Sequence, residues 1–325
     1  MLIRSKDTGK TGVFAEVSAA QAGWEWLNMA ARRMNTGEKW QGNTGGYEYV
    51  HVIFGGKCHV RTSGGDFLNI GKRENVFVGK PYAVYLSRNT NFEIEALTDS
   101  FEIASCWVKT EEDHPAQLVT PESSAVELRG GNNASRQINS IIPPGFNCQR
   151  LVVVEVYTPG GNWSSYPPHK HDIHRVDENG KVIEADLEEI YFYKLDRAEG
   201  YAYQRVYTDD RHIDAVMMAQ NHDMVLVPEG YHPVVSAHGY TTYYLNFLAG
   251  SAQSLANADD PAYAWVKETW TGIDPRLPIA RQNDGKEQAE CRESLLQLRD
   301  WRTRQELLRS SSGAGTLSSR CVLSY

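Results

Sequence analysis

The sequence contains few cysteines and none of the spacings in which cysteines usually bind metal or exchange electrons. Its five cysteines are odd in number and widely separated, and they form no CxxC pair. This arrangement argues against a thiol zinc clip and against a CxxC redox motif. We therefore expect reduced thiols.

Long hydrophobic runs and an excess of basic residues are also absent. No stretch approaches the roughly 18 apolar residues of a membrane span, and the first residues, MLIRSKDTGKTGVF, lack the apolar core of a signal peptide. Lys and Arg number 33 against 41 Asp and Glu, which gives a net charge of −8. Such a surface does not favour phosphate backbones or anionic lipid. We expect a cytoplasmic protein with no nucleic-acid or membrane partner.

Short segments rich in aromatic and β-branched residues fill both halves of the chain. The first half contains YEYVHVIFG, CHVRT, AVYL, FEIEAL and EIASCWV, and the second contains LVVVEVYTPGG, IYFYKL, GYAYQRVYTDD, MVLVPEG and YTTYYLNFLAG. Turn-forming residues separate these segments, which is typical of β-strands and hairpins. A polar stretch at 109–135, which contains proline, is expected to be a linker. The pattern predicts an all-β protein.

The two halves also resemble each other locally. Residues 76–84 can be laid on 225–233 without a gap, which places Ala83 opposite His232. Internal repetition of this kind predicts two copies of one β-domain. We expect a first domain at 1–125 and a second at 126–280.

The remaining residues indicate short peripheral helices and a helical tail. DDPAYAWVKETW has an aspartate before a first-turn proline, which predicts a short helix that packs on the second domain. In the tail, 281–325, apolar residues recur at helical spacing and SSSGAGTLSS follows. We expect an extra helix there with a flexible end.

The segment SSYPPHKHD carries the strongest chemical signal. His169 and His171 are separated by one residue, so on an extended strand both imidazoles project from the same face. Glu189 opens the segment EIYFYK, and His232 follows the turn VPEGY. Three neutral nitrogen donors and one carboxylate suit zinc, manganese or iron, with coordination positions left open. HxH also occurs in surface loops, but here the downstream glutamate and histidine follow in the order that cupins use.

Glu188 is an alternative to Glu189 as the carboxylate ligand. Adjacent residues of a strand point to opposite faces, so only one of the two can reach the ion. We prefer Glu189 because it directly precedes IYFY. Four other histidines are candidates for roles around the ligands or substrate, although each is an ordinary polar or core residue in the simpler interpretation: His174, His212, His222 and His238.

The chain resembles the family of 5-deoxy-glucuronate isomerase and 4-deoxy-5-keto-uronate isomerase. The resemblance is carried by SSYPPHKHD, LEEIYFYK, YQRVYTDDRHID, HDMVLVPEGYHPV, YYLNFLAG and DDPAYAWVKETW, with ENVFVGKPYAVYL in the first half. It spans roughly Phe14 to Pro278 and implies a bicupin, in which two jelly-roll barrels follow one another and only the second keeps the metal ligands. Ala83 fits a first barrel that has lost its ligand.

Two departures from the general cupin pattern accompany the resemblance. The insert DIHRVDENGKVIEADLE between His171 and Glu189 is long, and VPEGYH has one residue fewer than usual between glycine and histidine. Because the flanking motifs match, both are expected to be family traits. The residues after about Ala280 have no counterpart in the family.

The resemblance implies that 5-deoxy-D-glucuronate is isomerised to 5-dehydro-2-deoxy-D-gluconate, a step of myo-inositol catabolism. In such an aldose-ketose isomerisation a metal held by three histidines and one glutamate could act as a Lewis acid, and a general base is required to move a proton between adjacent carbons. From positions near cupin strands, the candidate bases are Glu229, Tyr243 and His238, with Tyr207 also possible. The candidate substrate-binding residues are Arg205, Lys170 and Tyr207, and a surface salt bridge is an equal interpretation of Arg205.

Two other functions fit the same ligand set. A cupin dioxygenase would use iron or nickel and consume oxygen, and a binding module would hold a sugar acid without converting it. No DNA-binding segment is visible in the sequence, and the negative charge does not favour a regulator. Because cupins commonly pair through exposed strands, we expect a homo-oligomer that takes a small sugar acid as its ligand.

Overall fold

A computed structural model describes residues 1–280 of the chain. Strands dominate, and the helical elements of this part are short: α1 (Ala19–Ala22) and the 3-10 helices η1 (Asn132–Ala134) and η2 (Ala264–Thr269). The helix predicted within DDPAYAWVKETW is thus present as η2. The predicted tail helix, with its apolar residues Leu295, Leu298, Trp301 and Leu308, lies outside the described residues. Among residues 1–280, no helix has both the length and the apolar character needed to cross a membrane.

The first barrel consists of a six-stranded and a four-stranded sheet. The larger has the order β11-β8-β5-β10-β3-β2 and the smaller β4-β9-β6-β7. The bounds of these strands are β2 (Gly12–Val17), β3 (Asn28–Met34), β4 (Lys39–Asn43), β5 (Tyr47–Gly55), β6 (Cys58–Thr62), β7 (Gly65–Ile70), β8 (Ala83–Leu86), β9 (Asn91–Ala96), β10 (Phe101–Lys109) and β11 (Gln117–Val119).

The second barrel repeats this plan with additions. Its larger sheet has the order β1-β21-β18-β23-β14-β13-β12 with β17 attached to β18, its smaller sheet has the order β15-β22-β19-β20, and β16 pairs with β24. The bounds are β1 (Leu2–Ile3), β12 (Ala125–Arg129), β13 (Arg136–Ile142), β14 (Val152–Thr158), β15 (Trp163–Ser164), β16 (His169–Lys170), β17 (Asp172–Val176), β18 (Val182–Leu195), β19 (Tyr201–Tyr207), β20 (Asp214–Gln220), β21 (Met224–Val227), β22 (Val234–Ser236), β23 (Thr242–Gly250) and β24 (Ala258–Asp259).

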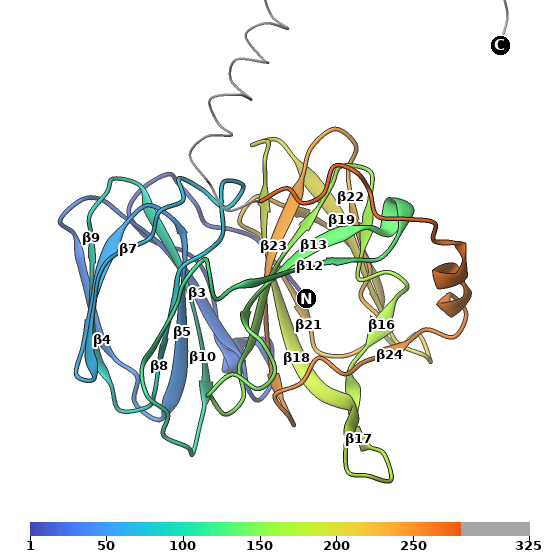
Figure 1. The fold of residues 1–325 in the computed structure, drawn as a ribbon, viewed down its shortest axis with the longest axis horizontal. Coiled ribbons are helices and arrows are strands. Elements are labelled where there is room, and N and C mark those ends of the chain that lie inside the picture. The colour runs from blue at the N-terminus through green and yellow to red at the C-terminus, as the bar shows by residue number, and fades with distance from the viewer. Residues whose placement is uncertain (281–325) are drawn as a thin grey trace, which may run out of the picture. The chain divides into compact units, whose positions relative to one another are not determined.

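The two larger sheets face each other at the centre of the molecule. Figure 1 shows the first barrel, in blue and teal, beside the second, in green to orange. One hydrophobic cluster joins them and includes Val52 and Phe54 of β5 with Phe192 of β18 and Phe247 of β23. Separate clusters fill the first barrel and line the second. Three cysteines, Cys58, Cys106 and Cys148, are buried free thiols in these cores.

Strand order relates the two barrels one to one. Strands β2 to β10 of the first barrel match β13, β14, β15 and β18 to β23 of the second, in the same chain order and with the same neighbours. In this match β8 corresponds to β21, because Leu86 pairs with Tyr49 of β5 as Val227 pairs with Glu189 of β18. The predicted alignment of 76–84 with 225–233 is therefore wrong. Ala83 corresponds to Met224, not to His232.

The stretch at 109–135 was expected to be a linker, but it contains two strands. Strand β11 completes the larger sheet of the first barrel by pairing with β8, and β12 pairs with β13 in the second barrel. At the other end of the sequence, β1 crosses to the second barrel and pairs with β21. The chain passes between barrels twice, which is why this segment has paired strands instead of free loop. The division into domains at residue 125 stays a prediction.

Two glutamates at equivalent positions tie the barrels together. Glu48 of β5 accepts hydrogen bonds from the backbone N–H groups of residues 149–151, which lead into β14, at 2.8 to 3.0 Å. Glu188 of β18 accepts three from residues 25–27, which lead into β3. Because β3 and β14 are themselves equivalent, the two contacts are reciprocal. Each carboxylate satisfies three backbone donors, of which those of Leu27 and Leu151 are buried.

Replacing Glu188 with alanine is expected to lower stability, because three N–H groups lose their acceptor. A buried donor left without an acceptor costs about 1 to 3 kcal/mol, and a partly exposed one costs less because water can replace the acceptor. We therefore expect the melting temperature to fall by roughly 5 °C or more. Thermal unfolding followed by circular dichroism measures it. Glu48→Ala should behave alike, and exposed Glu127→Ala serves as the control. An unchanged melting temperature for both buried sites would contradict this role for the carboxylates.

Candidate metal centre

Alternation along the strands decides which side chains enter the second barrel. On β18, Glu189 and Tyr191 line a pocket inside the barrel, whereas Ile190 and Phe192 join the central cluster between barrels. Glu188 also points away from the pocket, toward residues 25–27. Of the two neighbouring glutamates, Glu189 is therefore the one that faces the barrel interior.

Three predicted ligands converge in this pocket. Ligand atoms of His171, Glu189 and His232 all lie within 4.8 Å of one another, and all three residues are buried. Nε2 of His171 is 3.0 Å and Nε2 of His232 is 3.3 Å from the same carboxylate oxygen, Oε2 of Glu189. Two imidazole nitrogens and a carboxylate in this arrangement are suited to a divalent first-row ion.

His169 lies beside this group without belonging to it. Its ring centroid is 4.9 Å from that of His232, and it lines the same pocket. His169 is only partly buried. Its role as the fourth ligand stays a prediction.

Backbone carbonyls orient the two buried rings. Nδ1–H of His171 donates to the carbonyl oxygen of Leu187 at 2.9 Å, and Nδ1–H of His232 donates to that of Gly230 at 2.8 Å. These bonds turn Nε2 of each ring toward Glu189, as in metal sites whose ligands are held by a second layer of hydrogen bonds. Nε2 of His232 is buried and makes no hydrogen bond. A buried, unsatisfied nitrogen beside a carboxylate fits a metal site.

The protonation of the three rings follows from burial and from Glu189. Although the residue as a whole is partly exposed, desolvation of its ring lowers the pKa of His169 to about 3, with the charge of Arg136 acting in the same direction. Burial also lowers the pKa of His232 to about 3. For His171 burial acts to lower the pKa, but the hydrogen bond to Glu189, the charges of Glu189 and Asp172 and the hydrogen bond to Leu187 together outweigh it, and the pKa is raised. Metal and proton therefore compete for His171, and metal affinity is expected to fall as the pH is lowered.

Local structure shows what the two segments that depart from the cupin pattern form. The long insert after His171 is a hairpin of β17 and β18 that extends away from the barrel (Figure 1). Before His232, Gly230 has φ of +92°, and a Cβ there would lie 2.6 Å from the carbonyl oxygen of Tyr207. Only glycine fits this tight turn. Asp172 fixes the turn from the hairpin side, since it accepts the Gly230 N–H at 2.7 Å.

The pocket is narrow and mixed in character. Its volume is about 80 Å³. Apolar walls come from Ile138, Val154, Val156 and Leu248, polar groups from Arg136, Ser165, Tyr191, Tyr244 and Asn246, and the mouth from Glu127, Arg129 and Asn257.

The three candidate bases lie elsewhere among the described residues. Tyr243 points to the central cluster and donates to Glu155 at 3.1 Å, because its neighbour Tyr244 takes the pocket side of β23. Glu229 is half-exposed and pairs with His212 at 3.1 Å. His238 is exposed in the turn between β22 and β23. None of the three lines the metal pocket.

The candidate substrate-binding residues also point away from the pocket. Arg205 forms two 2.8 Å hydrogen bonds with Asp214, which matches its alternative interpretation as a surface salt bridge. Lys170, between the two histidines, faces outward and pairs with Asp209. Tyr207 donates to Asp260 at 2.7 Å. Alternation of side chains along β16 and β19 separates all three from the metal ligands.

The remaining histidines make ordinary polar contacts. His174 is exposed and lies 2.9 Å from the hydroxyl of Ser251. His212 lies 2.7 Å from Asp210. His222 lies between Asp7 at 2.8 Å and the ammonium of Lys194 at 3.2 Å. These contacts are remote from the metal group.

The polar pocket residues that sequence reasoning missed include Arg136 and Asn246. Arg136 opens β13 after a glycine-containing turn, and Asn246 lies in the apolar-looking segment YYLNFLAG of β23. The signal that could have found Asn246 is alternation, since it shares a strand face with Tyr244 and Leu248.

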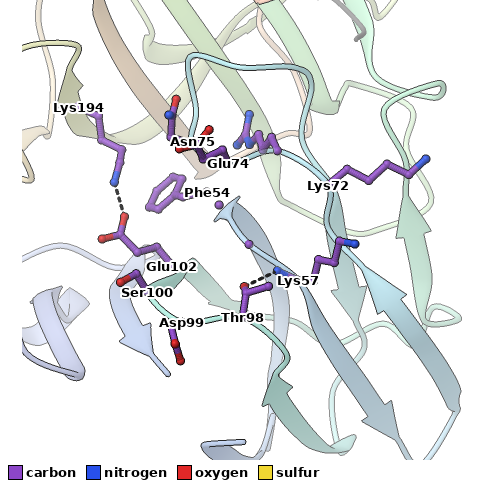
Figure 2. Close-up of a pocket in the computed structure, with 13 residues that line it drawn as sticks. Phe54, Lys57, Lys72, Glu74, Asn75, Thr98, Asp99, Ser100, Glu102 and Lys194 are labelled. Atoms are coloured by element: carbon purple, nitrogen blue, oxygen red, sulfur yellow. Dashed lines mark hydrogen bonds and ion pairs between the residues drawn. The ribbon is translucent and has the colours of Figure 1, made fainter. Parts of the chain in front are cut away.

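A larger cavity of about 610 Å³ lies where the barrels meet (Figure 2). Its lining includes the end of β5, residues 72–75 and 98–102, and Lys194 of β18. Lys194 is paired with Glu102, as the dashed line in Figure 2 shows, and Glu102 also binds Arg33 at 2.6 Å. Although this cavity is larger, we do not assign the active site to it. Within residues 1–280, the group of possible metal ligands lies in the smaller pocket of the second barrel.

The fold and the ligand group define a bicupin with a candidate metal site in its second barrel. The chain belongs to the KduI/IolB family, whose model matches residues 1–266. It is 40% identical over 269 residues to a curated 5-deoxy-glucuronate isomerase of Geobacillus thermodenitrificans, which covers 82% of this chain and 96% of that one. It is 39% identical over 255 residues to the protein of that name from Bacillus subtilis strain 168, which covers 78% and 92%.

Solved structures agree with this assignment. An IolB-like protein from Salmonella typhimurium LT2 aligns with a TM-score of 0.76 and 34% identity, covering 82% of this chain and 98% of that one. An oxalate decarboxylase of Bacillus subtilis aligns with a TM-score of 0.55 and 13% identity, covering 80% and 79%. The second likeness shows the fold alone. The predicted all-β bicupin and the predicted family are confirmed.

Proposed function

We propose that this chain isomerises 5-deoxy-D-glucuronate to 5-dehydro-2-deoxy-D-gluconate. The observation that carries the proposal is the similarity to a curated relative named 5-deoxy-glucuronate isomerase. The two chains are 40% identical, and the alignment covers 96% of the relative. The buried histidine and glutamate group supports it, because an aldose-ketose isomerisation needs an electrophile to polarise the carbonyl.

His171, Glu189 and His232 would hold a divalent ion, with His169 as the fourth ligand. Zinc, manganese and iron suit these donors. When bound, the ion would act as a Lewis acid that polarises the substrate carbonyl and makes the neighbouring C–H more acidic.

The residues around the ligands would orient the substrate and keep water out. Apolar side chains of β13 and β14, including Ile138 and Val154, form the walls. The hydroxyl of Tyr191 lies 3.1 Å from Ser165 and faces the same pocket, so it can donate to a sugar oxygen. Strands on all sides fix these groups before the substrate arrives, which favours a single productive orientation.

Conversion of 5-deoxy-D-glucuronate, followed by NMR, tests the proposal. We expect the ketone to form without oxygen uptake, to stop after chelation of the metal, and to resume when zinc, manganese or iron is returned. An oxygen electrode run in parallel separates isomerisation from dioxygenase chemistry. Unchanged substrate with metal demonstrably bound would overturn the proposed activity.

A further inference from the structure

The metal pocket contains a buried cation without a carboxylate partner. Arg136 is 5% exposed and lines the pocket, and no ion pair with it is found among the described residues. Its hydrogen bonds run from one nitrogen, NH1, to the carbonyl oxygens of Ala134 at 3.4 Å and Tyr166 at 3.3 Å. Buried guanidinium groups normally face a carboxylate or phosphate, because isolating the charge from water is expensive.

Two other arginines, one exposed more than Arg136 and one buried like it, do have carboxylate partners. At the mouth, Arg129 is already bound by Glu127 through two 2.8 Å hydrogen bonds. In the centre of the molecule, buried Arg73 is bound by Glu155. Arg136 is buried as Arg73 is, but no carboxylate among the described residues pairs with it.

The same pocket has another unused donor. The amide nitrogen Nδ2 of Asn246 is buried and makes no hydrogen bond. Asn246 pairs with Tyr191 across β18 and β23, and Tyr191 lies two residues beyond the ligand Glu189. A cation without a counter-ion and an amide donor without a hydrogen-bond partner, both lining the pocket of the metal group, call for an anionic ligand rich in oxygen.

We propose that Arg136 binds the carboxylate of the substrate inside the metal pocket, with Asn246 donating to another oxygen of the same molecule. This inference rests on the proposed function, since it names the residue that selects a sugar acid over a neutral sugar. A guanidinium can bind a carboxylate through two parallel N–H groups. Anchored at Arg136, the acid end is fixed and the aldehyde end is directed toward the metal ligands.

The proposal predicts a loss that depends on the substrate's charge. Arg136→Gln is expected to lower kcat/KM for 5-deoxy-D-glucuronate about 100-fold, mainly through KM, because a charge-assisted hydrogen bond is lost. For the primary amide of the same compound, which has no negative charge, the loss should be less than threefold. Arg136→Lys keeps the charge without the planar fork and should lose about 10-fold on the acid.

The matched control is Arg205→Gln, which removes an exposed arginine already paired with Asp214. Its kcat/KM for the acid should stay within threefold of the unsubstituted protein. Circular dichroism and metal content, measured for every variant, separate a binding effect from a damaged fold. Equal losses on acid and amide in the Arg136 variants, or an acid-specific loss in Arg205→Gln alone, would overturn the proposal.

Direct binding separates this inference from the proposed reaction. D-Gluconate is a sugar acid with no carbonyl to isomerise, and calorimetry measures its affinity whether or not the protein is an isomerase. We expect Arg136→Gln to weaken D-gluconate at least 10-fold and Arg205→Gln to leave it unchanged. If the protein converts no 5-deoxy-D-glucuronate yet binds D-gluconate through Arg136, only the proposed function fails. Unaltered binding by both Arg136 variants rejects the carboxylate site.

Discussion

Replacing His171 with alanine is expected to lower kcat/KM for 5-deoxy-D-glucuronate about a thousandfold or more. Lewis-acid activation of a carbonyl contributes several kcal/mol to lowering a barrier, and each 1.36 kcal/mol is worth a factor of about ten. His171 is buried, its Nε2 lies 3.0 Å from Glu189, and its other nitrogen is fixed by Leu187. Loss of this ring leaves a ligand set that binds metal poorly.

Two measurements check this expectation independently. Metal content by mass spectrometry should fall together with turnover in His171→Ala and in Glu189→Ala. His174→Ala is the matched control, since it removes an exposed histidine three positions further along that contacts Ser251. Full metal content and activity in both ligand variants would place the catalytic centre outside this pocket.

The sequence could predict which side chains of a single strand share a face. An HxH pair on an extended segment places two rings on one face, and His169 and His171 do line one pocket. The same rule makes Glu188 and Glu189 diverge, and Glu188 does turn toward residues 25–27. Short-range geometry depends only on the chain's own alternation, so it needs no knowledge of neighbouring strands.

Contacts between distant strands were beyond this reasoning. Tyr243 and Tyr244 are equally plausible in the sequence, and the register of β23 against β14 and β18 decides which one enters the pocket. Arg205 lies in an aromatic strand as a binding residue would, yet Asp214 of the next strand neutralises it. Arg136 gives no local signal, because its importance comes from the absence of a counter-ion. Register and partner identity are tertiary properties.

The internal repeat shows the same limit at the level of domains. Nine similar residues suggested that Ala83 replaces His232. Strand pairing shows instead that Tyr49 occupies in the first barrel the position that Glu189 occupies in the second. Around this position the first barrel contains packed aromatic rings. The ring centroids of Trp40 and Phe92 lie 5.5 and 5.0 Å from that of His51. Where the second barrel keeps a polar pocket, the first has an aromatic core. Topology survives in both although the residue similarity misleads.

Replacing Glu155 with leucine is expected to destabilise the protein by about 3 to 5 kcal/mol, because Arg73 would be left charged in the centre of the molecule. The side chains of Arg73 and Glu155 are 2% and 0% exposed, with Arg73 NH1 3.0 Å from the carboxylate. Arg73 comes from the first barrel and Glu155 from β14 of the second, so the pair joins the two. A fall in melting temperature of roughly 6 to 20 °C is the expected signal.

The double variant distinguishes charge isolation from lost packing. A buried ion pair replaced by apolar side chains of similar size is often neutral or stabilising, whereas removing one partner is costly. Arg73→Met combined with Glu155→Leu should therefore recover much of the stability lost by either change alone, in a cycle measured by urea unfolding. The carboxylate also accepts from Asn139 at 2.9 Å and Tyr243 at 3.1 Å, so recovery should be incomplete. Additive losses in the double variant would show that the two charges act separately, and would contradict a stabilising ion pair between the barrels.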